Sequence, residues 1–215
     1  MGRSAGTEGT GGRHGLSLAV GLLVVQVLDI VASWQIHAGA VFSDAAADVL
    51  VLVDGLTTGV FVAMAIALLV ATARGDASRT NRFAFAYLLM ATVQVTFNVV
   101  LMVASGHTRD DSLLWGLWDL GAAYLLIVVV FTGWYWWCDR VISGGAFVFP
   151  TREGTADHRP NVVDYMFIAF NTNSTFGPTS EDVVSRRVKA LMMYQTLLSL
   201  AILFVFVARI VGLAN

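Results

Sequence analysis

Residues 188–213 read VKALMMYQTLLSLAILFVFVARIVGL, an almost unbroken apolar run in which only Lys189 and Arg209 are charged. A transmembrane helix needs about 20 consecutive, mostly apolar residues, because the hydrocarbon core of a bilayer is about 30 Å thick. The run is long enough to meet that requirement. It therefore predicts a membrane-spanning helix near the carboxyl end of the chain.

Other apolar stretches earlier in the chain meet the same length criterion. The predicted spans are residues 15–36, 46–73, 83–104, 112–137 and 188–213. Residues 1–14, rich in Gly, Ser and Thr, are predicted to form a disordered tail, and residues 74–82 a polar loop. The sequence thus predicts an all-α integral membrane protein with about five transmembrane helices. Residues 15–105 form its three-span amino-terminal region.

The composition of the 215-residue chain supports this class of protein. Hydrophobic residues make up 57% of the chain and charged residues 13%, against about 25% charged in soluble domains. A net charge of −2 offers no basic surface for nucleic acid. A single cysteine, Cys138, and four scattered histidines predict neither a metal site nor a cofactor, and no catalytic pattern predicts an enzyme. We expect a multi-pass protein of a bacterial inner membrane, with the lipid bilayer as its main partner.

A different kind of segment lies between the last two spans. Residues 139–161 are polar, residues 162–170 form an apolar run too short to cross a bilayer, and hydroxyl and amide residues follow. One interpretation is a re-entrant helix near residues 162–178, because non-helical backbone at membrane depth needs surrounding protein or a water-filled cavity. The other is a helix lying flat at the membrane interface.

Residues 163–180 read VDYMFIAFNTNSTFGPTS and precede Arg186, Arg187 and the last span. This pattern resembles the pore module of two-helix potassium channels, in which a short pore helix leads into a filter, a turn, a basic residue and the inner helix. It more closely resembles a group of uncharacterised bacterial multi-pass membrane proteins that share the stretch and lack the potassium signature. The resemblance covers about the last 80 residues and predicts a pore-like, two-span module at residues 112–215. It implies a symmetric homo-oligomer, a tetramer if the module forms a pore.

The stretch departs from the potassium filter at two positions. Thr175 stands where the family has its first filter glycine, and Pro178 replaces an acidic residue. A β-branched residue resists the backbone angles that glycine allows, so potassium selectivity is not implied. The resemblance implies passive movement of an inorganic cation through a loop whose predicted lining is Asn171, Thr172, Asn173, Ser174, Thr175, Phe176 and Gly177. A pore-like fold that conducts nothing is the alternative.

Polar residues inside the predicted spans suggest a second function. Counting from one membrane face, they lie at one level, roughly 9–13 Å deep at 1.5 Å per residue. This intramembrane polar cluster comprises Asp29, Asp54, Asn98 and Asp119 at that level, with Arg209 about one turn nearer the face. Ionisable residues inside spans are costly and often functional, so the cluster could bind a cation or relay protons in an ion-coupled transporter. Polar contacts that only hold helices together are the alternative.

The distribution of positive charge favours one orientation. Lys and Arg in short loops lie mainly on the cytoplasmic side of membrane proteins. With five spans, one side carries all the basic residues except Arg109 and Arg209. This places the amino terminus and residues 139–187 in the cytoplasm, whereas the resemblance to potassium channels places residues 139–187 outside. The sequence leaves both orientations open.

Overall fold

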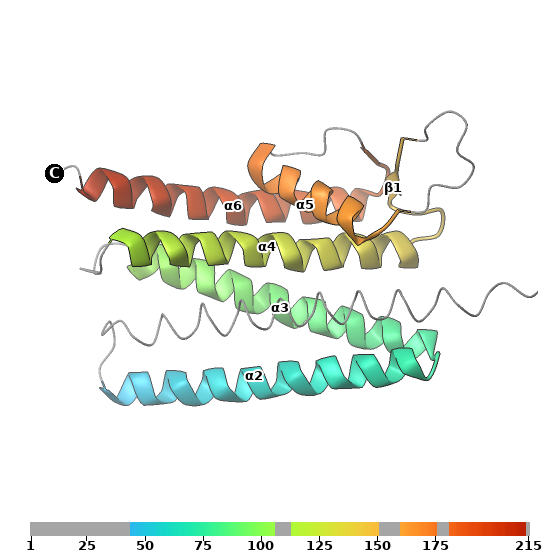
Figure 1. Ribbon diagram of the computed structural model, residues 1–215, viewed down its shortest axis with the longest axis horizontal. Helices are drawn as coiled ribbons and strands as arrows, with labels where there is room; N and C mark the ends of the chain where they lie inside the picture. Colours follow the sequence, from blue (N-terminus) through green and yellow to red (C-terminus); the bar gives the residue numbers. More distant parts are fainter. Residues whose placement is uncertain (1–43, 106–112, 151–159, 176–180, 214–215) are drawn as a thin grey trace, which may run out of the picture.

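Figure 1 presents a computed structural model that describes the backbone of residues 44–105, 113–150, 160–175 and 181–213. Side chains are described for residues 55–103, 120–150, 160–174 and 181–211. The described chain is mainly helical, as the sequence predicts. Its helices are α2 (Asp44–Ala73), α3 (Ala77–Ser105), α4 (Leu113–Val141), α5 (Val162–Thr175) and α6 (Arg186–Leu213), and its strands are β1 (Phe147–Val148) and β2 (Asp182–Val183).

Four of these helices are long and apolar enough to cross a membrane, which is the character of a multi-pass membrane protein. Their apolar windows are Gly55–Ala73, Ala77–Val103, Leu120–Val141 and Arg186–Val211. They agree with four of the five predicted spans. The fifth, residues 15–36, and the predicted tail, residues 1–14, lie outside the described residues.

The connection between α2 and α3 is a tight turn, so the predicted polar loop at residues 74–82 is wrong. Gly75 adopts φ 68°, a left-handed conformation that glycine reaches without strain. Asp76 then caps α3, because its Oδ1 accepts a hydrogen bond of 3.0 Å from the backbone N–H of Arg79. Its Oδ2 also lies 3.1 Å from the Arg79 Nε. This cap starts the helix at Ala77, six residues before the predicted span begins.

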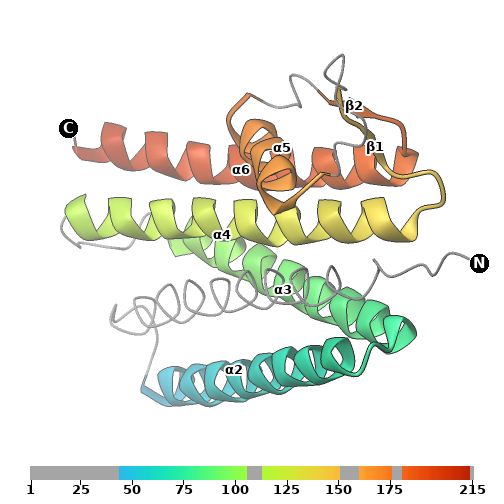
Figure 2. The same cartoon turned by 45° about the vertical axis from the view of Figure 1, so that its right-hand side comes forward.

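The helices pack in layers around an antiparallel pair formed by α4 and α6 (Figures 1 and 2). On one side α3 packs against both members of the pair, and α2 packs against α3. On the other side α5 packs against α4 and α6. The short β1–β2 pairing lies at the end of the bundle where α4 ends and α6 begins (Figure 1). The site described below is built from α4, α5 and α6.

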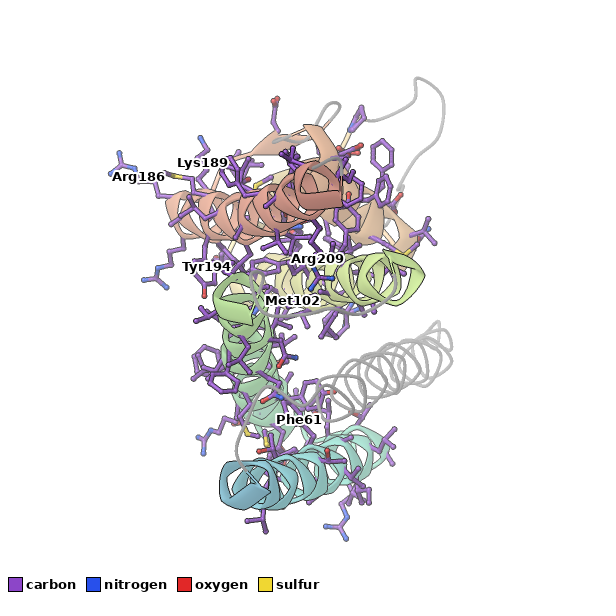
Figure 3. The ribbon with its side chains drawn as sticks, turned by 90° about the vertical axis from the view of Figure 1, so that its left-hand side faces the viewer. Phe61, Met102, Arg186, Lys189, Tyr194 and Arg209 are labelled. Atoms are coloured by element: carbon purple, nitrogen blue, oxygen red, sulfur yellow. The ribbon has the colours of Figure 1, made fainter. Side chains whose placement is uncertain are left out.

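Side-chain hydrogen bonds and close packing join α3 to its neighbours. Trp134 donates from Nε1 to the Thr92 hydroxyl at 2.8 Å, which joins α4 to α3. The Thr96 and Tyr194 hydroxyls lie 2.5 Å apart and join α3 to α6; Figure 3 shows Tyr194 between these two helices. On the α2 side, Phe61 meets Tyr87 edge to face, with ring centroids 5.3 Å apart.

At Gly133, α4 lies close to a side chain of α3. A Cβ placed on Gly133 would lie 2.7 Å from Cδ2 of Leu88, which is buried. We therefore expect Gly133→Ala to lower the free energy of unfolding by about 1–3 kcal/mol, because the buried leucine has to move. The check is a thermal unfolding midpoint in detergent. Gly121→Ala on the same helix is the matched control, since a Cβ there meets nothing within 4 Å. Equal midpoints for the two variants would contradict the packing described.

Candidate functional site

The start of α5 is fixed by its own sequence. Asn161 Oδ1 accepts a hydrogen bond of 2.7 Å from the backbone N–H of Val163. In return, the Asn161 N–H donates to Asp164 Oδ2 at 2.6 Å. This reciprocal arrangement is a capping box. The short helix therefore begins at Val162 and points its amino end at the carboxyl end of α4.

A group of contacts around Asp139, called here the outer cluster, holds this end of α5. Asp139 Oδ1 accepts hydrogen bonds from the backbone N–H groups of Ala146 (2.6 Å) and Phe147 (3.0 Å). Its Oδ2 accepts a hydrogen bond of 2.6 Å from the Tyr165 hydroxyl. Burial and the neighbouring Asp139 carboxylate raise the pKa of Tyr165, so its phenol stays protonated and donates at neutral pH.

The connection between α4 and α5 folds over this cluster. Gly144 and Gly145 turn the chain with φ values of 85° and 80°. A side chain at Gly145 would strain this backbone and place its Cβ 3.2 Å from Asp139 Oδ1. The turn brings β1 beside β2, with Phe147 opposite Val183. The Phe147 ring also lies between those of Tyr135 and Tyr165, at centroid distances of 5.6 and 6.1 Å.

A second group of contacts, called here the inner cluster, holds the other end of α5. It comprises Tyr135 of α4, Asn173 of α5, and Gln195 and Ser199 of α6. Gln195 Nε2 donates hydrogen bonds to the Ala169 carbonyl oxygen at 2.7 Å and to Asn173 Oδ1 at 2.6 Å. Its Oε1 accepts a hydrogen bond from the Tyr135 hydroxyl. The Gln195 side chain is fully buried and all three helices meet around it.

Asn173 completes the inner cluster. Its Oδ1 accepts a second hydrogen bond from the Ser199 hydroxyl at 2.6 Å, and its Nδ2 lies 3.4 Å from the Tyr124 carbonyl oxygen. The cluster contains no carboxylate, imidazole or ammonium group. Amide side chains donate and accept hydrogen bonds without exchanging protons at neutral pH. The inner cluster is therefore suited to holding the helices in place and not to relaying protons.

The two clusters lie at different levels of the bundle. The outer cluster lies beside the last residues of α4, which ends at Val141. The inner cluster involves Gln195 and Ser199, 9 and 13 residues beyond the start of α6 at Arg186. At 1.5 Å per residue this is about 14–20 Å along the helix, near its midpoint. Thus α5 runs from the end of the α4–α6 pair to the middle of it (Figure 2).

The predicted pore-loop residues are helical where they are described. Asn171, Thr172, Asn173, Ser174 and Thr175 form the last turns of α5. Thr172 and Asn173 are buried against α4 and α6, whereas Ser174 is exposed. The Thr172 hydroxyl donates to the Ile168 carbonyl oxygen at 2.8 Å. Phe176, Gly177 and the side chain of Thr175 lie outside the described residues, so the complete loop stays a prediction.

The predicted intramembrane polar cluster is only partly described. Asn98 is buried in α3 and Arg209 is half-buried near the end of α6. Figure 3 shows Arg209 directed from α6 toward α4, near Met102. Among the described residues, Asn98 Nδ2 and one terminal nitrogen of Arg209 are buried without a hydrogen-bond partner, and no hydrogen bond joins these two residues. Asp29 and the side chains of Asp54 and Asp119 lie outside the described residues.

The sequence interpretation missed most of the inner cluster. Gln195 and Ser199 are polar residues inside a predicted span, so the criterion that selected Asn98 would also have selected them. In the aromatic run 134–137 of α4, Tyr135 is fully buried and Trp134 is 8% exposed, while Trp136 and Trp137 are only half-buried. No signal in the run itself separates the inward-facing rings from the others.

No protein-family model, curated protein or solved structure matches the chain. Within the described part of the chain, no group of three or more His, Cys, Asp or Glu side chains could hold a metal ion. The function is therefore argued from the geometry of α4, α5 and α6.

The outer cluster gives a testable expectation. Asp139→Asn keeps the size of the side chain but removes its negative charge and leaves only one acceptor oxygen. We expect it to lower the free energy of unfolding by about 1–3 kcal/mol, because charge-assisted hydrogen bonds are lost. Protease cleavage within residues 142–161 should also accelerate. Asp182→Asn is the control, since Asp182 is exposed and its carboxylate accepts no hydrogen bond from the described residues. Matching cleavage rates would count against the cluster's role.

Proposed function

We propose that the protein is a channel-like membrane protein that lets inorganic cations move passively, without potassium selectivity. Several copies of the α4–α5–α6 unit would surround the pore. The observation that carries the proposal is the position of the carboxyl end of α5, which lies against Gln195 and Ser199, midway along the candidate membrane span of α6. A helix lying flat at the interface would contact only the ends of α4 and α6. The contacts of α5 with Gln195 and Ser199 therefore favour a re-entrant helix.

The direction of α5 suits a cation. The carboxyl end of a helix carries a partial negative charge, because its last four carbonyl groups have no N–H partner within the helix. This end would lie near the middle of the bilayer, where carbonyl groups facing lipid cost several kcal/mol each. These carbonyl groups would therefore need polar partners, and we propose that water in a pore supplies some of them. A water-filled path beside this end would attract cations and repel anions.

The polar side chains of α5 divide between two directions. Thr172 and Asn173 are buried within the protomer and already hydrogen-bonded. Ser174 is exposed at the same depth, and its hydroxyl donates to the Phe170 carbonyl oxygen at 2.9 Å, so its exposed oxygen would face a pore or a neighbouring subunit. From Ser174 toward the amino end of α5, the exposed side of the helix is apolar, with Val163, Phe167 and Phe170 between 46% and 61% exposed. Because each chain supplies one such helix, a pore needs a symmetric oligomer, four copies by the resemblance.

Selectivity for potassium is not part of the proposal. A potassium filter lines its path with carbonyl oxygens of extended backbone. Here α5 continues as helix through Thr175, so residues 171–175 cannot form such a row of carbonyls. We propose weak coordination of monovalent cations by the end of α5 and by Ser174.

An ion- or proton-coupled transporter is the second candidate. It is favoured by the two buried nitrogens of Asn98 and Arg209 that have no partner among the described residues. Unpaired polar atoms inside a span are costly and are expected to have a partner or a function. Asp29, Asp54 and Asp119 would supply the ion-binding carboxylates of this candidate.

Conduction is tested with purified protein in planar bilayers. We expect discrete current steps with a reversal potential set by cations. Ser174→Lys should reduce the cation current roughly 30-fold, because a unit charge about 8 Å from the path adds on the order of 2 kcal/mol at an effective dielectric constant near 20. Ser185→Lys, near the start of α6, is the matched control and should conduct normally.

Two outcomes would contradict the channel proposal. Silent bilayers over a wide voltage range would reject it. If liposomes then took up protons, and Asp29→Asn abolished the uptake, the transporter candidate would replace it. Current steps of unchanged size in Ser174→Lys would place the conducting path elsewhere in the protein.

The orientation is proposed from the charges. At the end of the bundle that carries α5, the described basic residues are Arg74, Arg79, Arg82, Arg140, Arg186, Arg187 and Lys189. Figure 3 shows Arg186 and Lys189 directed away from the bundle, whereas Arg209 lies near the opposite end. Such a bias favours the cytoplasmic side for the end with α5. We propose that α5 enters the membrane from the cytoplasm, opposite to the direction that the resemblance implies.

Labelling of an introduced cysteine checks the orientation. Cys138 is 8% exposed and is a poor target, so the test uses Asp182→Cys in a Cys138→Ala background. A membrane-impermeant maleimide should leave this cysteine unmodified in intact cells and modify it in inverted vesicles. Modification in intact cells would instead support entry from outside, as in potassium channels.

A further inference from the structure

We propose that Gln195 is a positioning residue that fixes the direction of the inner end of α5 and thereby sets which ions the pore admits. The effect on ions rests on the function proposed above, while the effect on α5 stands without it. Gln195 itself does not contact the ion. It acts through Asn173 and Ala169, which are part of α5.

The chemistry of the site requires a glutamine. Both hydrogens of the Gln195 amide are used, on the Ala169 carbonyl oxygen and on Asn173 Oδ1, and its oxygen accepts from the Tyr135 hydroxyl. Because Nε2 lies between two acceptors, the orientation of the amide is determined. A carboxylate would place a negative charge beside these two acceptor oxygens. A leucine would remove the amide oxygen that accepts from the Tyr135 hydroxyl and leave that hydroxyl with its contact to Thr172.

The inner cluster contributes more to the orientation of the inner end of α5 than to the free energy of unfolding. Polar contacts between membrane helices are worth about 0.6 kcal/mol each on average. Apolar contacts and the outer cluster still hold α5 when Gln195 is replaced, since Tyr165 and Ile168 are buried independently of it. A hydrogen bond restricts the angle between the two groups that it joins, whereas the hydrophobic effect is non-directional. Without Gln195 we expect α5 to stay docked, with its inner end free to take several directions.

Gln195→Leu and Gln195→Glu are the test variants. Gln94→Leu is the matched control, because Gln94 lies half-buried in α3 and its side chain makes no hydrogen bond among the described residues. The first readout is the permeability ratio of sodium to chloride, taken from reversal potentials in planar bilayers. We expect Gln195→Leu to change it at least about threefold and Gln94→Leu to leave it unchanged, at equal oligomer size. An unchanged ratio in a conducting Gln195→Leu protein would overturn the effect on ions.

The second readout does not depend on conduction. Spin labels at Ser174→Cys and Ile66→Cys, in a Cys138→Ala background, report the distance from the inner end of α5 to exposed Ile66 of α2 across the bundle. Labelled chains are diluted into unlabelled chains, so that only distances within one protomer are measured. We expect a broader distance distribution in both Gln195 variants than in Gln94→Leu. If all distributions have the same width, Gln195 does not position α5. If the widths differ but bilayers are silent, only the proposed function fails.

Discussion

The structure depends on one constraint, which is that polar groups inside an apolar bundle must find partners within the protein. Several threonines meet it locally, because their hydroxyls donate to the carbonyl four residues earlier in the same helix, as Thr92 and Thr132 do. The amide side chains of Asn173 in α5 and Gln195 in α6 have no such bond within their own helix. They meet between helices instead, and this requirement brings Asn173 against Gln195 and Ser199.

This constraint explains how α5, which has 14 residues against 28 in α6, can be held in place. α5 is attached at two levels, by Tyr165 to Asp139 and by Asn173 to Gln195. These two residues of α5 are eight positions apart, about 12 Å along the helix. Two attachments to the same pair of helices fix both the position and the tilt of α5. A helix held in this way can present its carboxyl end at a defined depth, as the proposed function needs.

The sequence predicts the long helices well and the site poorly. The four candidate spans that the structure describes follow from apolar length alone, since a bilayer requires that length. The start of α3 was missed because one capping residue, Asp76, outweighs the polar character of residues 77–82. Thr172 and Asn173 were expected to line a pore, but their side chains lie inside the protomer. Which side of α5 faces inward depends on Gln195 and Tyr135, residues distant in sequence, so no local pattern reveals it.

The central claim is that the inner end of α5 lies near the middle of the membrane. The most direct test is the depth of a spin label at Ser174→Cys, measured in lipid bilayers by its collisions with oxygen and with a water-soluble nickel complex. A label at Asp182→Cys supplies the reference level of the membrane surface. The Ser174 label should lie about 15 Å deeper than the reference. Equal depths for the two labels would mean that α5 lies flat at the interface and would contradict the account.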